Sequence, residues 1–195
     1  MKSIDTLLRT GRTLRVAGFD DAPFEKVPGA PVPVSGIICN GTRMEGMLWG
    51  TAHRDGDDAT EVIASLLEGS KFHDQVHVVL LDGLAVGGFN LIDLPTLAER
   101  LDRPCAAVMR KPPDMPGIRR ALDRFEDAER RHALVDRAGE IYNEGPFYFQ
   151  VKGTTPVEMG RALTHLTDRG HVPEALRLAH LIGAAVITGE SSRRA

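Results

Sequence analysis

The chain has 195 residues, of which 42% are hydrophobic, enough for one domain with a substantial core. Its 24 Lys and Arg residues against 27 Asp and Glu residues give a net charge of −3. This balance excludes a globally basic nucleic-acid-binding protein, but it does not exclude a local basic groove. We expect a single domain over 1–195 with its core at about 12–188. Apolar segments are too short for a signal peptide or a membrane span, which predicts a cytoplasmic protein without membrane contact.

The N-terminal half of the sequence predicts three strands before any strong helix. These strands are Leu14–Phe19, Val34–Asn40 and Met44–Ala52. The last two flank Asn40-Gly41, and an Asn-Gly pair between apolar runs is the strongest short signal for a β-hairpin. The prolines of Gly29–Pro33 favour a loop, because proline cannot donate a hydrogen bond to a ladder. Met1–Gly11 is a polar lead that fits either a frayed helix or an additional strand.

The most informative strand is expected at Val76–Leu81, where five of six residues are apolar. Such a run is typical of a parallel strand that is buried on both faces. It ends at Asp82 and Gly83, and in open α/β sheets ligands bind outside the carboxyl ends of the strands. A single Asp at a strand end is more often a turn or cap residue, so its interpretation depends on what lies near it.

Helices and strands alternate after the hairpin. The expected helices are one that begins at Asp57 or Asp58, then Asp93–Leu101, Pro116–Phe125, Asp127–Ala138, Pro156–Thr167 and Val172–Ile187. The other expected segments are a glycine-rich loop at Leu84–Asn90, strands at Pro104–Met109 and Pro146–Val151, and a tail at Gly189–Ala195.

This order predicts an α/β protein with a ribonuclease H-like fold. Its five-stranded mixed sheet would have three antiparallel strands, then alternating helices and strands, with an extra C-terminal strand and helices. In that architecture the first strand lies beside the fourth, which would place Asp20 next to Asp82. A flavodoxin-like or Rossmann-like sheet would explain the second half of the chain but not the opening hairpin. Neither a GxGxxG motif after a strand nor a P-loop is present.

Three acidic clusters could meet at one edge of the predicted sheet. They are Asp20-Asp21, the group Asp55, Asp57 and Asp58, and Asp82. Each cluster alone fits a turn or a helix cap. Together, carboxylates without clustered Cys or His favour Mg²⁺ or Mn²⁺ over zinc. Such a site supports phosphodiester hydrolysis assisted by one or two metal ions.

Several basic residues could contact phosphate. Arg110 and Lys111 follow a strand next to the central one, so they should emerge at the same edge. Arg119 and Arg120 lie on a basic helix, although a basic helix face is usually only solvated. His180 lies on an apolar helix, where a structural role is the usual one.

Six segments resemble the endonuclease dU family, a largely archaeal group related to endonuclease V. They are Gly18–Phe24, Asp55–Thr60, Leu81–Gly83, Gly88–Asn90, Arg110–Pro112 and Pro173–His180. The similarity covers roughly 12–195. It implies a ribonuclease H-like fold and a metal-dependent endonuclease in DNA repair. The expected substrate is DNA containing deaminated bases, deoxyuridine in particular and deoxyinosine in addition.

The resemblance also implies roles for individual residues. Asp20, Asp58 and Asp82 match acids that bind the metal and act in catalysis, with His180 as a further residue of the metal site. A catalytic lysine of endonuclease V corresponds to Lys111 or Arg110. The cofactor would be Mg²⁺ or Mn²⁺. Arg110 and Lys111, with Arg119 and Arg120, would contact DNA.

One feature of endonuclease V is missing from this sequence. Its Pro-Tyr-Ile-Pro wedge has no counterpart around Trp49–Asp58, so the loops Ala22–Pro33 and Leu84–Asn90 are the candidates for contact with the lesion. Two other functions stay open, namely a non-catalytic nucleic-acid- or protein-binding module and a nucleotide phosphohydrolase. A homodimer could form if Tyr142–Val151 is an edge strand that pairs with a second copy.

Overall fold

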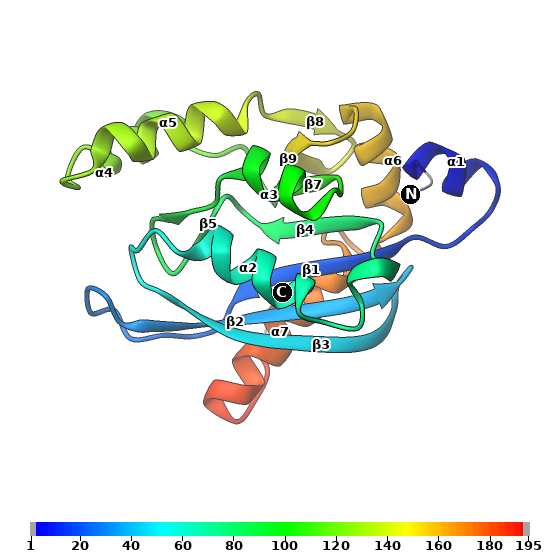
Figure 1. Ribbon diagram of the computed structural model, residues 1–195, viewed down its shortest axis with the longest axis horizontal. Coiled ribbons are helices and arrows are strands. Elements are labelled where there is room, and N and C mark those ends of the chain that lie inside the picture. Colours follow the sequence, from blue (N-terminus) through cyan, green and yellow to red (C-terminus); the bar gives the residue numbers. More distant parts are fainter. Residues whose placement is uncertain (1–2, 193–195) are drawn as a thin grey trace.

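The computed structural model describes residues 3–192 and has a mixed α/β fold (Figure 1). The main sheet contains β1 (Arg15–Asp21), β2 (Pro31–Asn40), β3 (Arg43–His53), β4 (Val78–Asp82), β7 (Cys105–Met109), β8 (Tyr142–Glu144) and β9 (Phe147–Lys152). A separate small hairpin consists of β5 (Ala85–Val86) and β6 (Asn90–Leu91). The helices are α1 (Ile4–Arg9), α2 (Ala59–Glu68), α3 (Leu94–Leu101), α4 (Met115–Leu122), α5 (Ala128–Ala138), α6 (Pro156–His165) and α7 (Glu174–Thr188), with a 3₁₀ turn at His73–Gln75. The first two residues of the predicted lead and the last three of the predicted tail lie outside the described residues.

The strands of the main sheet lie in the order β3-β2-β1-β4-β7-β9-β8. The predicted hairpin is confirmed, because β2 and β3 pair antiparallel around Asn40 and Arg43. β1 pairs antiparallel with β2 and parallel with β4, as the expected neighbourhood of the first and fourth strands requires. The carboxyl ends of β1 and β4 therefore meet at one edge of the sheet.

Two details of the predicted sheet were wrong. The sheet has seven strands, not five with one addition, because the segment after α5 folds into a β8–β9 hairpin with β8 at the edge. The proposed loop at Gly29–Pro33 is mostly the start of β2. There the carbonyl of Pro33 accepts a hydrogen bond from the N–H of Ala22, just past the end of β1. The nitrogens of Pro31 and Pro33 therefore face β1 beyond the last β1–β2 pair, where no hydrogen bond from them is needed.

Two other segments contain regular structure that the sequence did not define. The glycine-rich loop Leu84–Asn90 contains most of the β5–β6 hairpin. Ile4–Arg9 of the polar lead forms the short helix α1. None of the helices within residues 3–192 is long and apolar enough to cross a membrane.

Apolar side chains of the sheet pack on both of its faces. On one face Ala17, Phe19 and Leu81 pack with α2 and α3. On the other face Val16 and Leu80 pack with α1, α6 and α7 (Figure 1). Side chains alternate along a strand, so every second residue faces the same way. Asp82, two residues after Leu80, and Asp20, four residues after Val16, therefore face α7.

Candidate metal centre

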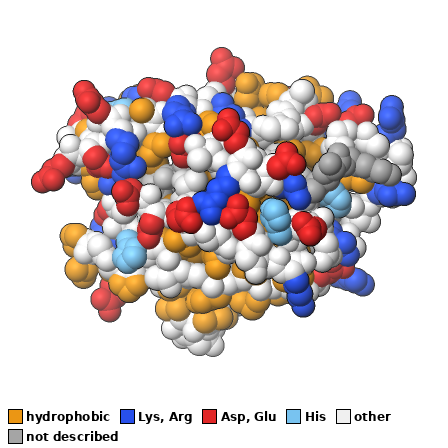
Figure 2. Space-filling view, in the orientation of Figure 1, with side chains coloured by type: hydrophobic (Ala, Val, Ile, Leu, Met, Phe, Trp, Pro, Cys, Tyr) orange, Lys and Arg blue, Asp and Glu red, His pale blue; other side chains and the backbone are white. Residues whose placement is uncertain are grey.

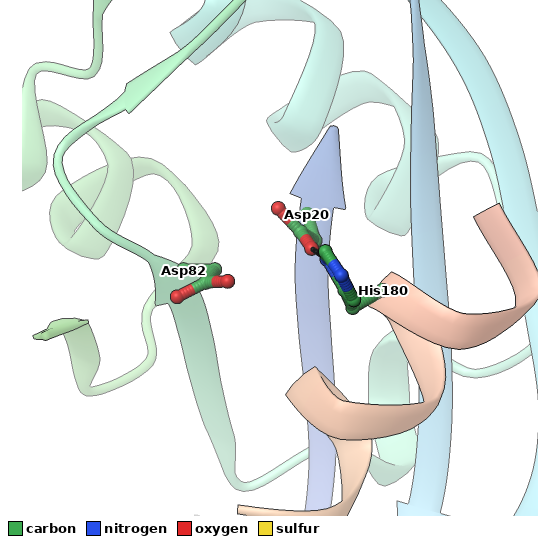
Figure 3. Close-up of side chains that lie close together, drawn as sticks. All are labelled: Asp20, Asp82 and His180. Atoms are coloured by element: carbon green, nitrogen blue, oxygen red, sulfur yellow. Dashed lines mark hydrogen bonds and ion pairs between the residues drawn. The ribbon is translucent and has the colours of Figure 1, made fainter. Parts of the chain in front are cut away.

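Three side chains from distant parts of the chain lie together at the carboxyl edge of the sheet. Asp20 lies near the end of β1, Asp82 ends β4, and His180 comes from α7 (Figure 3). One ligand atom from each residue lies within 4.8 Å of the other two. Among the described residues, this is the group that brings three such ligands together.

The register between β1 and β4 explains why the two acids face each other. The strands pair in parallel with Gly18 opposite Leu80 and Phe19 opposite Leu81. The next residue of each strand is an acid, Asp20 in β1 and Asp82 in β4, and both point toward α7. A shift of one residue in the pairing register of either strand would turn its carboxylate to the opposite face of the sheet.

Close packing of α7 against the sheet brings His180 to the acids. A Cβ atom on Gly18 would lie 2.8 Å from Ala175 of α7, so only glycine allows this approach. A Cβ atom on Gly183, one turn after the histidine, would lie 3.1 Å from Ala22. The helix therefore lies flat on β1 and β2, and His180 Nδ1 forms a 2.9 Å hydrogen bond with Asp20 Oδ2.

The electrostatics of the three neighbouring acids favour a cation at this position. Asp20 is only 8% exposed, and its burial together with the charges of Asp82 and Asp21 raises its pKa to about 8. Burial also raises the pKa of Asp82, although Arg110, whose Nη2 lies 3.4 Å from Asp82 Oδ2, partly opposes this. Without a cation the site therefore holds a proton at neutral pH, and a divalent cation can replace it. Two carboxylates and one imidazole form an oxygen-rich donor set that fits Mg²⁺ or Mn²⁺.

Asp21 points to the opposite face of β1 and has a different contact. Its Oδ2 accepts a 2.6 Å hydrogen bond from the backbone N–H of Gly87, in the turn of the β5–β6 hairpin. Burial raises the pKa of Asp21, and the hydrogen bond from Gly87 acts against that rise. Asp21 thus ties the hairpin to the end of β1, directly beside the candidate metal centre.

The structure does not bring Asp58 into the three-residue group. Its carboxylate accepts hydrogen bonds from the backbone N–H of His53 and from Asn90 Nδ2, at 3.1 and 2.6 Å, and lies 2.6 Å from His53 Nδ1. Although partial burial acts to raise it, these hydrogen bonds hold the pKa of Asp58 below its ordinary value. Asp58 stands at the N-cap position of α2, but Asn90 Oδ1 accepts the hydrogen bond from Ala59 N instead. The metal-binding role of Asp58 stays a prediction.

The four residues predicted to contact phosphate differ in their contacts. Arg110 contacts Asp82, whereas the exposed side chains of Lys111 and Arg120 make no hydrogen bond or ion pair within residues 3–192. Arg119 bridges α4 and α5 through Asp136. On the face covered by α2 and α3, acidic and basic side chains are interspersed, without a large basic field (Figure 2).

The sequence did not single out Arg131 as a structural residue, although its guanidinium joins three segments. The side chain is only 5% exposed and donates to the carbonyls of Asp55 and Phe89 and to the carboxylate of Asp127. It also stacks on Phe125, 4.2 Å from the ring centroid. On a basic helix such a residue looks like its solvated neighbours, so the sequence carries no local signal for it.

Sequence and structure comparisons agree on the relatives of this chain. The sequence profile of the family "Endonuclease dU" matches residues 12–187. A UPF0215 protein of Methanothermobacter thermautotrophicus is 40% identical over 183 residues, which cover 91% of this chain and 90% of that protein. A crystal structure of a protein of unknown function from Archaeoglobus fulgidus is similar with a TM-score of 0.85 and 34% identity, over 90% of this chain and 99% of that one.

Endonuclease V has a similar fold at much lower identity. The Bacillus subtilis enzyme superposes with a TM-score of 0.63 at 11% identity, over 97% of this chain and 84% of that one. A Ciona intestinalis endonuclease V, solved with DNA containing an inosine followed by a ribo-adenosine, has a TM-score of 0.54 at 13% identity, over 87% and 84% of the two chains. At these identities the likeness shows the fold alone. The match across nearly the whole sequence is what places the chain in the endonuclease dU family.

Proposed function

We propose that this chain is a metal-dependent endonuclease that cleaves DNA containing deaminated bases. The observation that carries the proposal is the Asp20, Asp82 and His180 cluster, in a fold similar to that of endonuclease V. The strand order β3-β2-β1-β4-β7 supports the expected ribonuclease H-like sheet, to which β9 and β8 would be additions. The family name and the inosine-containing DNA bound to a structural neighbour support deoxyuridine and deoxyinosine as the lesions.

Each residue of the cluster would have a separate task in this reaction. Asp20 and Asp82 would hold Mg²⁺ or Mn²⁺ through their carboxylate oxygens. His180 would be a further residue of the metal site, and its hydrogen bond would fix the orientation of Asp20. When bound, such a cation lowers the pKa of a water molecule and offsets negative charge on the scissile phosphate. Arg110, which is 42% exposed at its side chain, would turn between Asp82 and a phosphate oxygen. Lys111 would hold the next phosphate, and Asp58 would assist by positioning Asn90 and the hairpin.

Cleavage of defined DNA by the purified protein tests this proposal. Oligonucleotides with a single uracil or hypoxanthine are incubated with the protein and Mg²⁺ or Mn²⁺. We expect nicking that requires the cation and is lost in Asp82→Asn, while Asp57→Asn, which changes an exposed acid nearby, cleaves normally. Failure to nick any damaged or undamaged DNA or RNA refutes the proposal. Cation-independent binding that Asp82→Asn leaves unchanged would instead identify a binding module.

A further inference from the structure

A cavity of about 280 Å³ adjoins the metal centre. Its wall begins at Gly83, the residue after Asp82, and continues along the β5–β6 hairpin, α4, α5 and β9. Binding sites for small molecules span roughly 300–1,000 Å³, so this volume suits a single small ring system. The proposed cation and phosphate contacts leave this cavity unused.

Most of the cavity wall is apolar, and one side of it is aromatic. Leu84, Leu91, Met115 and Val135 contribute aliphatic surface, and Phe89 adds an aromatic ring. The ring of Phe89 packs edge-on against Phe125, with the ring centroids 5.7 Å apart. An aromatic ring held in this way offers a stacking surface for a nucleobase, a contact that every base can make.

Gln150 is the polar side chain of the wall, and its orientation is fixed. It is only 4% exposed, and its Nε2 donates a 2.8 Å hydrogen bond to the carbonyl of Gly139. Because a carbonyl can only accept, the amide nitrogen must face Gly139 and the amide oxygen must face away from it. Among residues 3–192, no donor bonds to this Oε1. This oxygen is therefore free to accept a hydrogen bond from a ligand that enters the cavity.

We propose that Gln150 Oε1 accepts a hydrogen bond from the ring N–H of a deaminated base bound in this cavity. Uracil carries N3–H and hypoxanthine N1–H, whereas the same positions of cytosine and adenine are acceptors. An amide oxygen held at that position attracts the deaminated base and repels the parent base. Thymine shares the N3–H, so Gln150 distinguishes uracil from cytosine and not from thymine. This inference rests on the proposed action on deaminated DNA and assigns its selectivity to one residue.

The test changes the protein and the base together. Single-stranded oligonucleotides carry uracil, N3-methyluracil or cytosine at one position, and both cation-dependent cleavage and equilibrium binding are measured. We expect wild-type protein to prefer uracil over each of the other two bases by at least about tenfold. Gln150→Met removes the acceptor at similar length and should abolish the preference for uracil over cytosine. The matched control is Gln75→Met, because Gln75 also donates to a backbone carbonyl but lies far from the cavity, before β4.

Each result separates the inference from the proposed function. An unchanged uracil preference in Gln150→Met, or no preference in the wild type, overturns the role of Gln150 even if DNA is cleaved. A uracil preference in binding that depends on Gln150, without cleavage, supports the inference and refutes the endonuclease. If Gln150→Met does not fold, Gln150→Asn withdraws the same amide oxygen by one methylene and should give the same loss.

Discussion

Replacing Asp20 by Asn should stabilise the cation-free protein while it abolishes cation binding. Burial of the Asp20 carboxylate beside Asp82 and Asp21 raises its pKa to about 8, far above the ordinary value of 3.8. A group with a raised pKa in the folded state binds more protons folded than unfolded, so its stabilising contribution is complete below pH 4 and is lost as the pH rises toward 8. Over three pH units, from about pH 5 to about pH 8, this loss amounts to at most about 4 kcal/mol. Asn carries no charge, so the Asp20→Asn variant does not lose this stability as the pH rises.

Thermal unfolding in EDTA between about pH 5 and about pH 8 measures this difference. The melting temperature of the wild type should fall relative to Asp20→Asn by up to about 10 °C over this range. Added Mn²⁺ should raise the melting temperature of the wild type and not that of the variant. Asp57→Asn, at an exposed position, should follow the wild type. A pH-independent difference, or equal stabilisation of both proteins by Mn²⁺, would refute the assignment of Asp20 as a buried cation ligand.

Three further substitutions test other parts of the site. Arg131→Met leaves the carbonyls of Asp55 and Phe89 without this donor, and should lower the free energy of unfolding in urea by about 3 kcal/mol. Arg130→Met, at the exposed neighbouring position, should lower it by less than about 1 kcal/mol. Asp58→Ala leaves two hydrogen-bond donors unpaired and should cost about 1–2 kcal/mol of stability in the same assay, while a Mn²⁺ titration shows a smaller loss of affinity than in Asp82→Asn. Lys111→Ala should weaken DNA binding and reduce the slope of log affinity against log salt by about one, whereas Lys71→Ala, at the opposite end of the sheet, should leave both unchanged.

The sequence revealed the strands of the candidate metal centre more clearly than their surroundings. The buried run before Asp82 and the Asn-Gly hairpin depend on local patterns, and the structure confirmed both. The contact between Asp20 and His180 spans 160 positions in the chain, and it depends on Gly18 allowing α7 to approach. No local pattern encodes such a contact, and only the family resemblance pointed to it.

The role of the second acidic cluster could not be read from residue type. Asp55 and Asp58 look like cap residues or metal ligands in the sequence, but their carboxylates accept hydrogen bonds from Phe89 N and Asn90 Nδ2. Which partner a carboxylate finds depends on where the β5–β6 hairpin folds back. That hairpin is only two residues long in each strand and gave no strand signal of its own.

The acids of this edge therefore divide into two groups with different contacts. Asp20 and Asp82 face each other without enough positive charge nearby, which is costly unless a cation binds. Asp21 and Asp55 instead accept hydrogen bonds from backbone N–H groups of the hairpin turn. Asp55 adopts a left-handed backbone conformation, with φ at 56°, which short polar side chains tolerate. Because these bonds hold both sides of the turn, the hairpin that lines the cavity is tied to the end of β1 and to the segment after β3. Through the hairpin, Asp21 and Asp55 would then fix the position of a base in the cavity relative to Asp20 and Asp82.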